Sequence, residues 1–500
     1  MPRKLTPSFI TEIPLVVSPS EERTLLARLE AGRQLYNACL GESVRRVRLV
    51  KQSKLYQFAQ TIPRTVKGKP NQDRADAFKL AWDAYEFSDY SIQGYAIEIR
   101  NGGGGWIGAH IDADTAQKLG TRAFRAARNV MIGRASRVRF KGLNQMDSLE
   151  GKSPRSAMKW RDAAFHWKGL VLLPYLDRND PVMLHGLNSP VKYVRLVRRK
   201  INGRNWFYAQ LINDGKPFQK PKNVIGQDIV GADIGPSTIA VVGEAIAFLE
   251  PFCAELADKS KAIARLQRQM ARQQRANNPD CFGPSRCDLP KPGQKHGKRK
   301  LGKSIKGKKQ SNRSKRYQKV RQCKSTMERK LSAHRKSLQG ELVNKILAIG
   351  KAINIEKLSY RAFQKMFGRS VGKRAPGMFV ARLRQKAENA GGRVNEFSTV
   401  TTKLSQRCIC GRIQKKPLSQ RAHVCECGVN QQRDLFSGYL ARFVDADGYY
   451  QAEAALSGFQ GADSLLWSAW QQAGNQYRQS SIGSPRIVNV AAAQRQRRTT

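Results

Sequence analysis

The fold of this chain is decided at Ile229-Val230-Gly231-Ala232-Asp233-Ile234-Gly235, an apolar run that ends in an acidic residue and a glycine. Such a run predicts a buried strand that presents one carboxylate near its end. Gly235-Pro236-Ser237 predicts a turn, and residues 238–242 predict an antiparallel partner strand. A single aspartate in this place is often only a turn former, so a chemical role for Asp233 depends on further acidic residues.

Two further acidic residues stand where they can aim a carboxylate at the same point. Residues 352–356 form a second apolar run that ends in Glu356, and a predicted helix begins with Asp434. Strand with Asp, paired strand, long insertion, strand with Glu and helix with Asp is the order of an RNase H-type nuclease with a mixed sheet. The alternatives are that Glu356 pairs with Lys357 or Arg361 and that Asp434 only complements its helix dipole.

The three carboxylates predict a two-metal site. Carboxylate oxygens suit Mg²⁺, and two such ions about 3.5–4 Å apart activate water and stabilise the leaving oxygen in phosphodiester cleavage. We expect Asp233 to bridge both ions, and Glu356 and Asp434 to complete one each. No histidine is needed as a base, which fits the presence of only six in the chain.

The composition points to nucleic acid as the partner. The 500 residues include 90 Lys or Arg and 38 Asp or Glu, a net charge of +52 that would repel itself without a polyanion. No run approaches the roughly 18 apolar residues of a membrane-spanning helix, and the N-terminus lacks a signal-peptide core. We therefore expect several domains, no membrane partner, and a cytoplasmic, nucleoid-associated location.

Four of the nine cysteines lie within residues 408–427. Cys408-Ile409-Cys410-Gly411 and Cys425-Glu426-Cys427-Gly428 predict a zinc ribbon with four thiolate ligands. Zinc knuckles normally separate their cysteines by two residues, whereas one residue separates them here, and His423 is an alternative ligand. A degenerate ribbon, an iron-bound form and reduced thiols compete with bound zinc. The cysteines that we assign to packing or surface are Cys39, Cys253, Cys281, Cys287 and Cys323.

The N-terminal half alternates between strand and helix patterns. A strand over residues 8–17 precedes Ser18-Pro19-Ser20-Glu21, which predicts a helix start by its capping box. A second, basic helix is predicted from about Asp114 to Ile132, and Asn202-Gly203 predicts a hairpin between two strands. The basic residues that we expect to contact phosphate, with a solvated face as the alternative, are Arg28, Arg33, Arg45, Arg46, Arg122, Arg125, Arg128, Arg139 and Lys141.

Residues 251–350 predict a basic helical hairpin. Residues 291–330 contain 17 Lys or Arg and one acidic residue, a density that favours phosphate contact over solubility alone. The residues that we single out there are Arg313, Lys315 and Arg316.

In this order, the features resemble the TnpB-type RNA-guided nucleases of insertion sequences and the related compact type V CRISPR effectors. The resemblance covers most of the chain. After the last aspartate, the usual Asn-Ala-Ala of that family is replaced by Phe436-Ser437-Gly438. The segments that carry the resemblance are Tyr36-Asn37, Arg139-Phe140-Lys141, the hairpin, the basic insertion, Ile355-Glu356-Lys357-Leu358, the ribbon and Arg433-Asp434.

The resemblance implies an α/β multidomain protein with an RNase H-like (RuvC) mixed sheet, an inserted zinc ribbon, and an N-terminal wedge-like β-barrel that carries a helical recognition insert. It implies guide RNA and target DNA as partners, and Mg²⁺ and Zn²⁺ as cofactors of an RNA-guided DNA endonuclease. The expected divisions are the barrel at 1–20 and 136–222, the helical module at 21–135, the nuclease at 223–404 and 429–446, the ribbon at 405–428, and a C-terminal extension at 447–500.

Three other functions compete with this one. The first is a guided DNA-binding protein with an inactive or weak nuclease, favoured by the altered ribbon and by the residues after Asp434. The second is a transposase that joins DNA ends through the same carboxylates. The third is a general basic RNA-binding protein with a zinc ribbon, which leaves the carboxylates unexplained. Residues 447–500 predict either a capping helix or an RNA contact.

Overall fold

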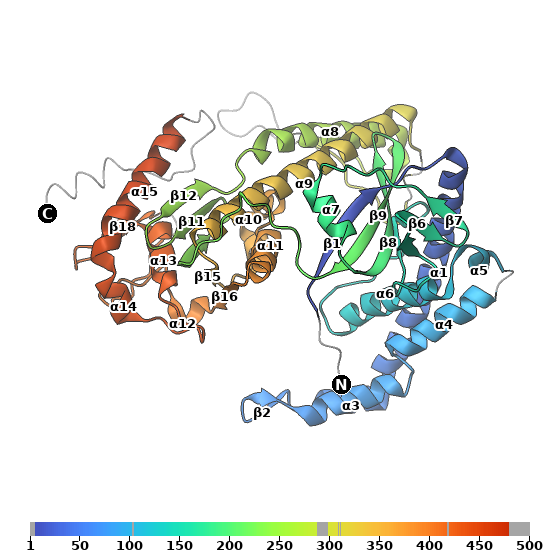
Figure 1. Cartoon of the computed structure of the whole chain (residues 1–500), viewed down its shortest axis with the longest axis horizontal. Coiled ribbons are helices and arrows are strands. Elements are labelled where there is room, and N and C mark those ends of the chain that lie inside the picture. The colour runs from blue at the N-terminus through green and yellow to red at the C-terminus, as the bar shows by residue number, and fades with distance from the viewer. Residues whose placement is uncertain are drawn as a thin grey trace. The chain divides into compact units, whose positions relative to one another are not determined.

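The computed structural model describes residues 6–102, 105–287, 299–308, 310, 312–417 and 420–479. The chain divides into two compact units, Met1–Phe218 and Gln219–Thr500 (Figure 1). Within the described ranges, no helix is long and apolar enough to cross a membrane. The basic residues expected over 291–298, and those at the extreme C-terminus, lie outside the described residues.

The first unit combines a helical layer with a four-stranded sheet, a three-stranded sheet and the two-stranded β2–β3 sheet. Its elements are β1 (Ser8–Pro14), α1 (Pro19–Gln52), α2 (Lys54–Thr61), β2 (Thr65–Val66), β3 (Lys69–Pro70), α3 (Gln72–Asp83), α4 (Asp89–Asn101), α5 (Trp106–His110), α6 (Ala113–Met131), β4 (Ser148–Glu150), β5 (Lys159–Arg161), β6 (Ala164–Trp167), β7 (Leu170–Leu172), α7 (Pro181–Leu187), β8 (Val191–Ile201) and β9 (Arg204–Asp214).

The predicted helix starts and the hairpin are confirmed. Ser18 and Glu21 form a capping box at the start of α1, and α6 ends within one residue of the expected position. Asn202 and Gly203 both have positive φ, 51° and 85°, as the two-residue turn between β8 and β9 requires. The period of apolar residues and the turn chemistry were therefore sufficient to place these elements.

The expected β-barrel is wrong. β1, β9, β8 and β4 form an open four-stranded sheet, and β5, β6 and β7 form a separate three-stranded one. Among the described residues the edge strands β1 and β4 do not pair. β4 has only three residues, and its buried Leu149 packs against Gly32 of α1 and near Leu119 of α6. α1 thus packs on a face of the sheet at β4, while the end of β1 is bridged by residues 173–175, which follow β7, and not by β4.

Two of the expected phosphate-binding arginines are buried instead. The Arg28 guanidinium donates to the carbonyls of Trp167 and Lys168, and only 6% of the residue is exposed. Arg46 is 8% exposed and donates to Glu42 and to the carbonyl of Glu86. Arginine looks polar in a sequence, but its long stem and fixed fork let it lie inside when carbonyls receive its donors.

The second unit is built on one mixed sheet. Its elements are β10 (Ile229–Ile234), β11 (Thr238–Val242), β12 (Ala247–Pro251), α8 (Leu256–Asn277), a 3₁₀ turn (Pro279–Cys281), β13 (Arg286–Cys287), β14 (Arg299–Lys300), α9 (Lys315–Ile349), β15 (Ala352–Glu356), α10 (Tyr360–Arg374), α11 (Pro376–Asn389), β16 (Arg393–Phe397), α12 (Thr399–Thr402), β17 (Ala422–Val424), β18 (Asn430–Gln432), α13 (Arg433–Arg442), α14 (Ala452–Ser457) and α15 (Phe459–Gln479).

The sheet has the strand order β12-β11-β10-β15-β16. β11 is antiparallel to both of its neighbours, whereas β10, β15 and β16 are mutually parallel. The expected antiparallel partner over residues 238–242 and the expected mixed sheet are thus present. The two predicted acidic strands, β10 and β15, lie side by side at the centre of the sheet.

Each face of this sheet packs against different helices. On one face, alternate residues of β10 and β15 form a core with the C-terminal part of α9 and with α11. On the other face lies α13, which is itself covered by α15 (Figure 1). Trp470 of α15 is 2% exposed, so the described part of the C-terminal extension acts as a capping helix. α8 and α9 form the expected helical hairpin.

Candidate functional site

Asp233 and Glu356 lie on the same face of adjacent parallel strands. Ala232 of β10 pairs with Ile355 of β15, and one further step along this register places Asp233 beside Glu356. Ala232 and Ile355 themselves point into the core on the opposite face. Because side chains alternate along a strand, both carboxylates face the layer that contains α13.

Asp434 comes to this face on the first turn of α13. The helix contacts β10, β11 and β15, and its backbone approaches β10 closely because two glycines meet there. A Cβ added to Gly231 would lie 1.9 Å from the carbonyl oxygen of Gly438. The close approach brings the start of α13, and with it Asp434, over the strands that carry the other two carboxylates.

The charges of these carboxylates interact. Burial and the negative charges of Asp434 and Glu356 raise the pKa of Asp233 well above its ordinary value, although Arg433 and Arg421 oppose the shift. Burial raises the pKa of Glu356. In the described part of the chain, the structure gives neither Asp233 nor Glu356 a side-chain hydrogen bond or an ion pair. These two half-buried acids therefore lack the partners that buried carboxylates normally have.

Asp434, in contrast, is held by two arginines. Arg433 donates two hydrogen bonds of 3.3 Å from Nε and Nη2 to Oδ1 of Asp434. Nη1 of Arg421 lies 3.7 Å from Oδ2 of the same carboxylate. The alternative contacts of Glu356 with Lys357 or Arg361 are not formed in the described residues, so Glu356 is not a simple ion-pair partner.

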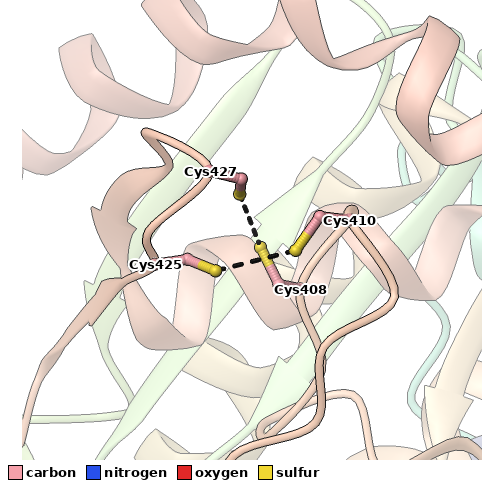
Figure 2. A group of neighbouring side chains, drawn as sticks. All are labelled: Cys408, Cys410, Cys425 and Cys427. Atoms are coloured by element: carbon pink, nitrogen blue, oxygen red, sulfur yellow. Dashed lines mark hydrogen bonds between the residues drawn. The ribbon is translucent and has the colours of Figure 1, made fainter.

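The four cysteines of the ribbon come together, and the carboxylates are less tightly gathered. The Sγ atoms of Cys408, Cys410, Cys425 and Cys427 all lie within 4.8 Å of one another, and among the described residues no other group of potential metal ligands is so compact (Figure 2). Cys408 and Cys427 are 3.5 Å apart, and Cys410 and Cys425 are 3.6 Å apart. Tetrahedral zinc with Zn–S bonds of about 2.3 Å requires sulfur atoms about 3.8 Å apart, so the thiols can hold zinc.

The two cysteine turns have the same backbone geometry in spite of their short spacing. The N–H of Cys408 donates to the carbonyl of Arg412 at 2.9 Å, and that of Cys425 donates to Val429 at 2.9 Å. Gly411 and Gly428 have φ of 87° and 91°, which favours glycine. Each glycine N–H returns to the carbonyl of its first cysteine at 3.1 Å. One residue between the cysteines is thus enough, because a left-handed glycine tightens each turn.

The position of His423 favours four cysteine ligands, whereas the thiols differ in ionisation: burial raises the pKa of Cys408 and of Cys427, and only that of Cys425 is lowered. Burial opposes ionisation of Cys425, but the backbone N–H of Cys427 and the neighbouring thiols outweigh it and lower the pKa of Cys425 to about 7. His423, the alternative ligand, lies outside the compact thiol group. Its ring packs on Phe436 with the centroids 4.4 Å apart, and Nδ1 contacts Nζ of Lys416.

The residues singled out for phosphate contact differ in exposure. Arg125, Arg128 and Arg139 are exposed, whereas Arg122 is half-buried and donates to the carbonyl of Ser148 at 2.9 Å. The backbone of Lys141 is fixed by two hydrogen bonds with the side chain of Asn37. In the second unit, Arg313, Lys315 and Arg316 are exposed at the start of α9.

Sequence reasoning overlooked the part played by Arg421 and Arg433. Both flank the β17–β18 hairpin that carries the second cysteine turn, and the N–H of Arg433 donates to the carbonyl of Arg421 at 2.8 Å. Only Arg433 had a sequence signal, its position directly before Asp434. Arg421 is twelve residues further upstream, and only the hairpin register brings it to the carboxylate.

Comparison with known proteins gave structural neighbours alone. No protein-family model matches the sequence, and no curated protein matches it. A Cas12f1–sgRNA–target DNA complex is similar at 10% identity and a TM-score of 0.42, covering 87% of this chain and 98% of that chain. A CRISPR-Cas12f ternary complex is similar at 10% identity and a TM-score of 0.28, covering 89% of this chain and 100% of that one. Because both TM-scores are low, any function proposed for this chain has to rest on the site itself.

Proposed function

We propose that this protein is an RNA-guided DNA endonuclease with an RNase H-like (RuvC) site formed by Asp233, Glu356 and Asp434. The observation that carries the proposal is that three distant segments bring carboxylates to one face of a mixed sheet, where Asp434 and Glu356 raise the pKa of Asp233. A fold gains nothing in stability from buried acids that repel one another and lack partners. A bound cation, however, would offset the repulsion between the carboxylates and the cost of burying them.

The donor set fits divalent metal. Carboxylate oxygens are the ligands that Mg²⁺ prefers, and Asp233 and Glu356 have free lone pairs because no side chain or backbone group occupies them in the described residues. Asp233, Glu356 and Asp434 would hold the divalent metal. Bound Mg²⁺ would supply an activated water and charge stabilisation for phosphodiester hydrolysis.

The two arginines beside Asp434 have a role that follows from their positive charge. Arg433 and Arg421 hold the carboxylate in place and leave positive charge beside it. A scissile phosphate that approaches the three acids would meet that charge, which offsets their repulsion. Zinc bound to the four thiols would fix the β17–β18 hairpin, from which both arginines extend.

The guide RNA and the target DNA are proposed from the sequence resemblance and from the charge of +52. On the same basis we propose that the first unit contains the wedge-like and helical recognition parts and that the second contains the nuclease. The exposed Arg125, Arg128 and Arg139 are the best candidates for contacts with phosphate, because solvent and a polyanion can reach them.

The test uses the full-length protein purified together with the RNA that it binds. RNA recovered from the preparation is sequenced, and duplex DNA that matches it is incubated with the complex and Mg²⁺. We expect cleavage by the wild type and by the control variant Asp258→Ala, which removes an exposed carboxylate of the same unit. We expect none by Asp233→Ala.

Each other outcome has a clear meaning. Tight binding of matching DNA without cleavage at any divalent metal would replace the endonuclease with a guided DNA-binding protein, an outcome consistent with the arginines that hold Asp434. Joined rather than cleaved DNA ends would indicate a transposase. Cleavage that persists in Asp233→Ala would refute the assignment of the site.

A further inference from the structure

A buried asparagine joins the strand that carries Glu356 to the helix that carries Asp434. Asn354 of β15 is 7% exposed, and its Nδ2 donates to the carbonyls of Ala441 at 2.9 Å and Val444 at 2.8 Å. A third, longer contact of 3.4 Å reaches the carbonyl of Arg442. An asparagine amide has two N–H donors, so both are used on the end of α13.

Its neighbour on the next strand makes a similar contact. Asn395 of β16 stands directly opposite Asn354 in the parallel register. Its Nδ2 donates to the carbonyl of Asp445 at 2.7 Å. The two asparagines therefore hold consecutive carbonyls of the segment that leaves α13, from two adjacent strands.

These contacts supplement the hydrogen bonds that end the helix. The last four carbonyls of a helix lack partners within it, and a left-handed residue after the helix commonly satisfies some of them. Here the residue after α13, Phe443, has φ of −95° and ψ of 23° and is not left-handed. The N–H groups of Phe443 and Val444 reach the carbonyls of Leu440 and Ala441 at 3.1 and 3.3 Å. Asn354 adds its donors to these and joins the end of the helix to β15.

The hydrogen bonds of Asn354 affect the site through α13, which is a short and rigid helix. Asn354 is two residues before Glu356, so the two side chains are on the same face of one strand. Ala441 is seven residues after Asp434 on α13, which is about 10 Å along a helix. If the far end of α13 is fixed to β15, and Gly231 fixes its middle to β10, the separation of Asp434 from the other carboxylates is set.

We infer that Asn354 is a positioning residue that sets the distance between Asp434 and the pair formed by Asp233 and Glu356. The inference rests on the proposed metal site, because the distance matters only if the three carboxylates share ions. Asn354 does not touch metal or substrate. It acts through α13, and its loss lets the helix tilt while the carboxylates themselves are retained.

The experiment measures binding of Mn²⁺ to the zinc-loaded full-length protein by electron paramagnetic resonance, well below the unfolding temperature. The relevant site is the one that Asp233→Ala removes. For Asn354→Ala we expect the Kd of this site to rise about tenfold, because partners that orient metal ligands typically contribute that much to affinity. Thermal unfolding is measured in parallel.

A matched control separates positioning from stability. Asn213 in the first unit is also buried, and its Nδ2 likewise donates to two carbonyls, those of Gly186 at 2.8 Å and Ser189 at 3.1 Å. Asn213→Ala should lower the unfolding temperature but leave the Kd for Mn²⁺ unchanged. A Kd of wild-type magnitude in folded Asn354→Ala overturns the inference.

If Asn354→Ala does not fold, Asn395→Ala provides the second variant, because it removes one hydrogen bond rather than two. A smaller rise in the Kd supports the inference, and an unchanged Kd overturns it. Absence of any Asp233-dependent Mn²⁺ site in the wild type would be a different result. It would refute the proposed function itself, and the inference with it.

Discussion

The contact between Gly231 and Gly438 can be tested by a pair of single substitutions with opposite expected results. In Gly231→Ala, the new methyl would lie 1.9 Å from the carbonyl oxygen of Gly438 and 2.7 Å from the backbone nitrogen of Arg442. Both are backbone atoms of α13, so no side-chain rotation relieves the overlap. In Gly438→Ala, the new methyl would meet a methyl of Val242 at 3.2 Å and the carbonyl oxygen of Gly231 at 3.5 Å.

The magnitudes follow from these distances. Ordinary contact begins at 3.4 Å, so Gly231→Ala must push α13 away by about 1.5 Å. Overpacking of this kind typically costs about 1–3 kcal/mol, and a displaced backbone puts Gly231→Ala at the upper end, about 3 kcal/mol. For a unit of this size the unfolding temperature should fall by roughly 6–12 °C. Gly438→Ala needs only a small shift of a side chain, and the gain in helix propensity of about 1 kcal/mol offsets it.

The rate of DNA cleavage should differ more between the two variants than their unfolding temperatures do. A shift of about 1 Å in a catalytic group can reduce the rate about 100-fold, so Gly231→Ala should lose cleavage even at temperatures where it is folded. Gly438→Ala should cleave at nearly the wild-type rate. Calorimetry and single-turnover cleavage measure the two effects. Equal unfolding temperatures for the wild type and Gly231→Ala would show that α13 does not pack on β10 as described.

Three further predictions concern metal, pH and nucleic acid. Cys425→Ser should lower bound zinc from one ion per chain to none by elemental analysis and lower the unfolding temperature, because structural zinc contributes directly to folding; full zinc occupancy would contradict four-thiolate coordination. Without added magnesium, stability should fall as the pH rises from the ordinary pKa of an aspartate, 3.8, to the higher pKa of Asp233 in the folded protein. Asp233→Asn should reduce this loss, of which Glu356 contributes a part through its own raised pKa, and raise the unfolding temperature at neutral pH. Replacing Arg125 and Arg128 by alanine should lower the dependence of DNA affinity on salt by about 0.9 for each phosphate that is no longer neutralised, whereas Arg122→Ala should chiefly lower stability, as fluorescence titration and calorimetry would show.

The sequence was sufficient to predict those elements whose signal comes from neighbouring residues. The apolar runs of β10 and β15, the capping box at Ser18, and the Asn202-Gly203 turn each depend on residues within a few positions. The cysteine cluster was also found from spacing, although a spacing of one residue is unusual. Such features follow from backbone preferences that neighbours in the sequence determine.

The remainder depends on partners that are distant in the sequence. Arg28 is buried because it finds carbonyls 139 and 140 residues away, and no pattern around it predicts them. Asn354 looks like an ordinary polar residue in an apolar run, yet its acceptors lie 87 to 90 residues later. The barrel prediction was wrong for a related reason, because the end of β1 is bridged by residues about 160 positions later, around Pro174, and not by β4. Long-range contacts of this kind become visible only in the folded chain.

Phe436-Ser437-Gly438 differs from the Asn-Ala-Ala of the family that the sequence resembles. The contacts of these residues are nevertheless compatible with a functional site. Phe436 is 1% exposed and packs on His423 at 4.4 Å between ring centroids, which links the start of α13 to the ribbon. Gly438 stands where the family that the sequence resembles has an alanine, but an alanine at this position would meet only the methyl of Val242 more closely than 3.4 Å. The strict requirement is at Gly231 on the strand.

The position of Asp434 is supported from three sides. Gln432 receives the N–H of Leu435 at 2.6 Å and begins α13, Gln431 donates to Asp463 of α15 at 2.7 Å, and Asn354 holds the opposite end of the helix. The ribbon, α15 and β15 therefore all help to fix the position of the Asp434 carboxylate. Because the other two carboxylates are fixed by the sheet, the variable distance in the site is the one to Asp434. Substitutions that affect the site without contacting metal should accordingly cluster at the residues that hold α13 in place, which include Gly231 of β10 and Asn354 of β15.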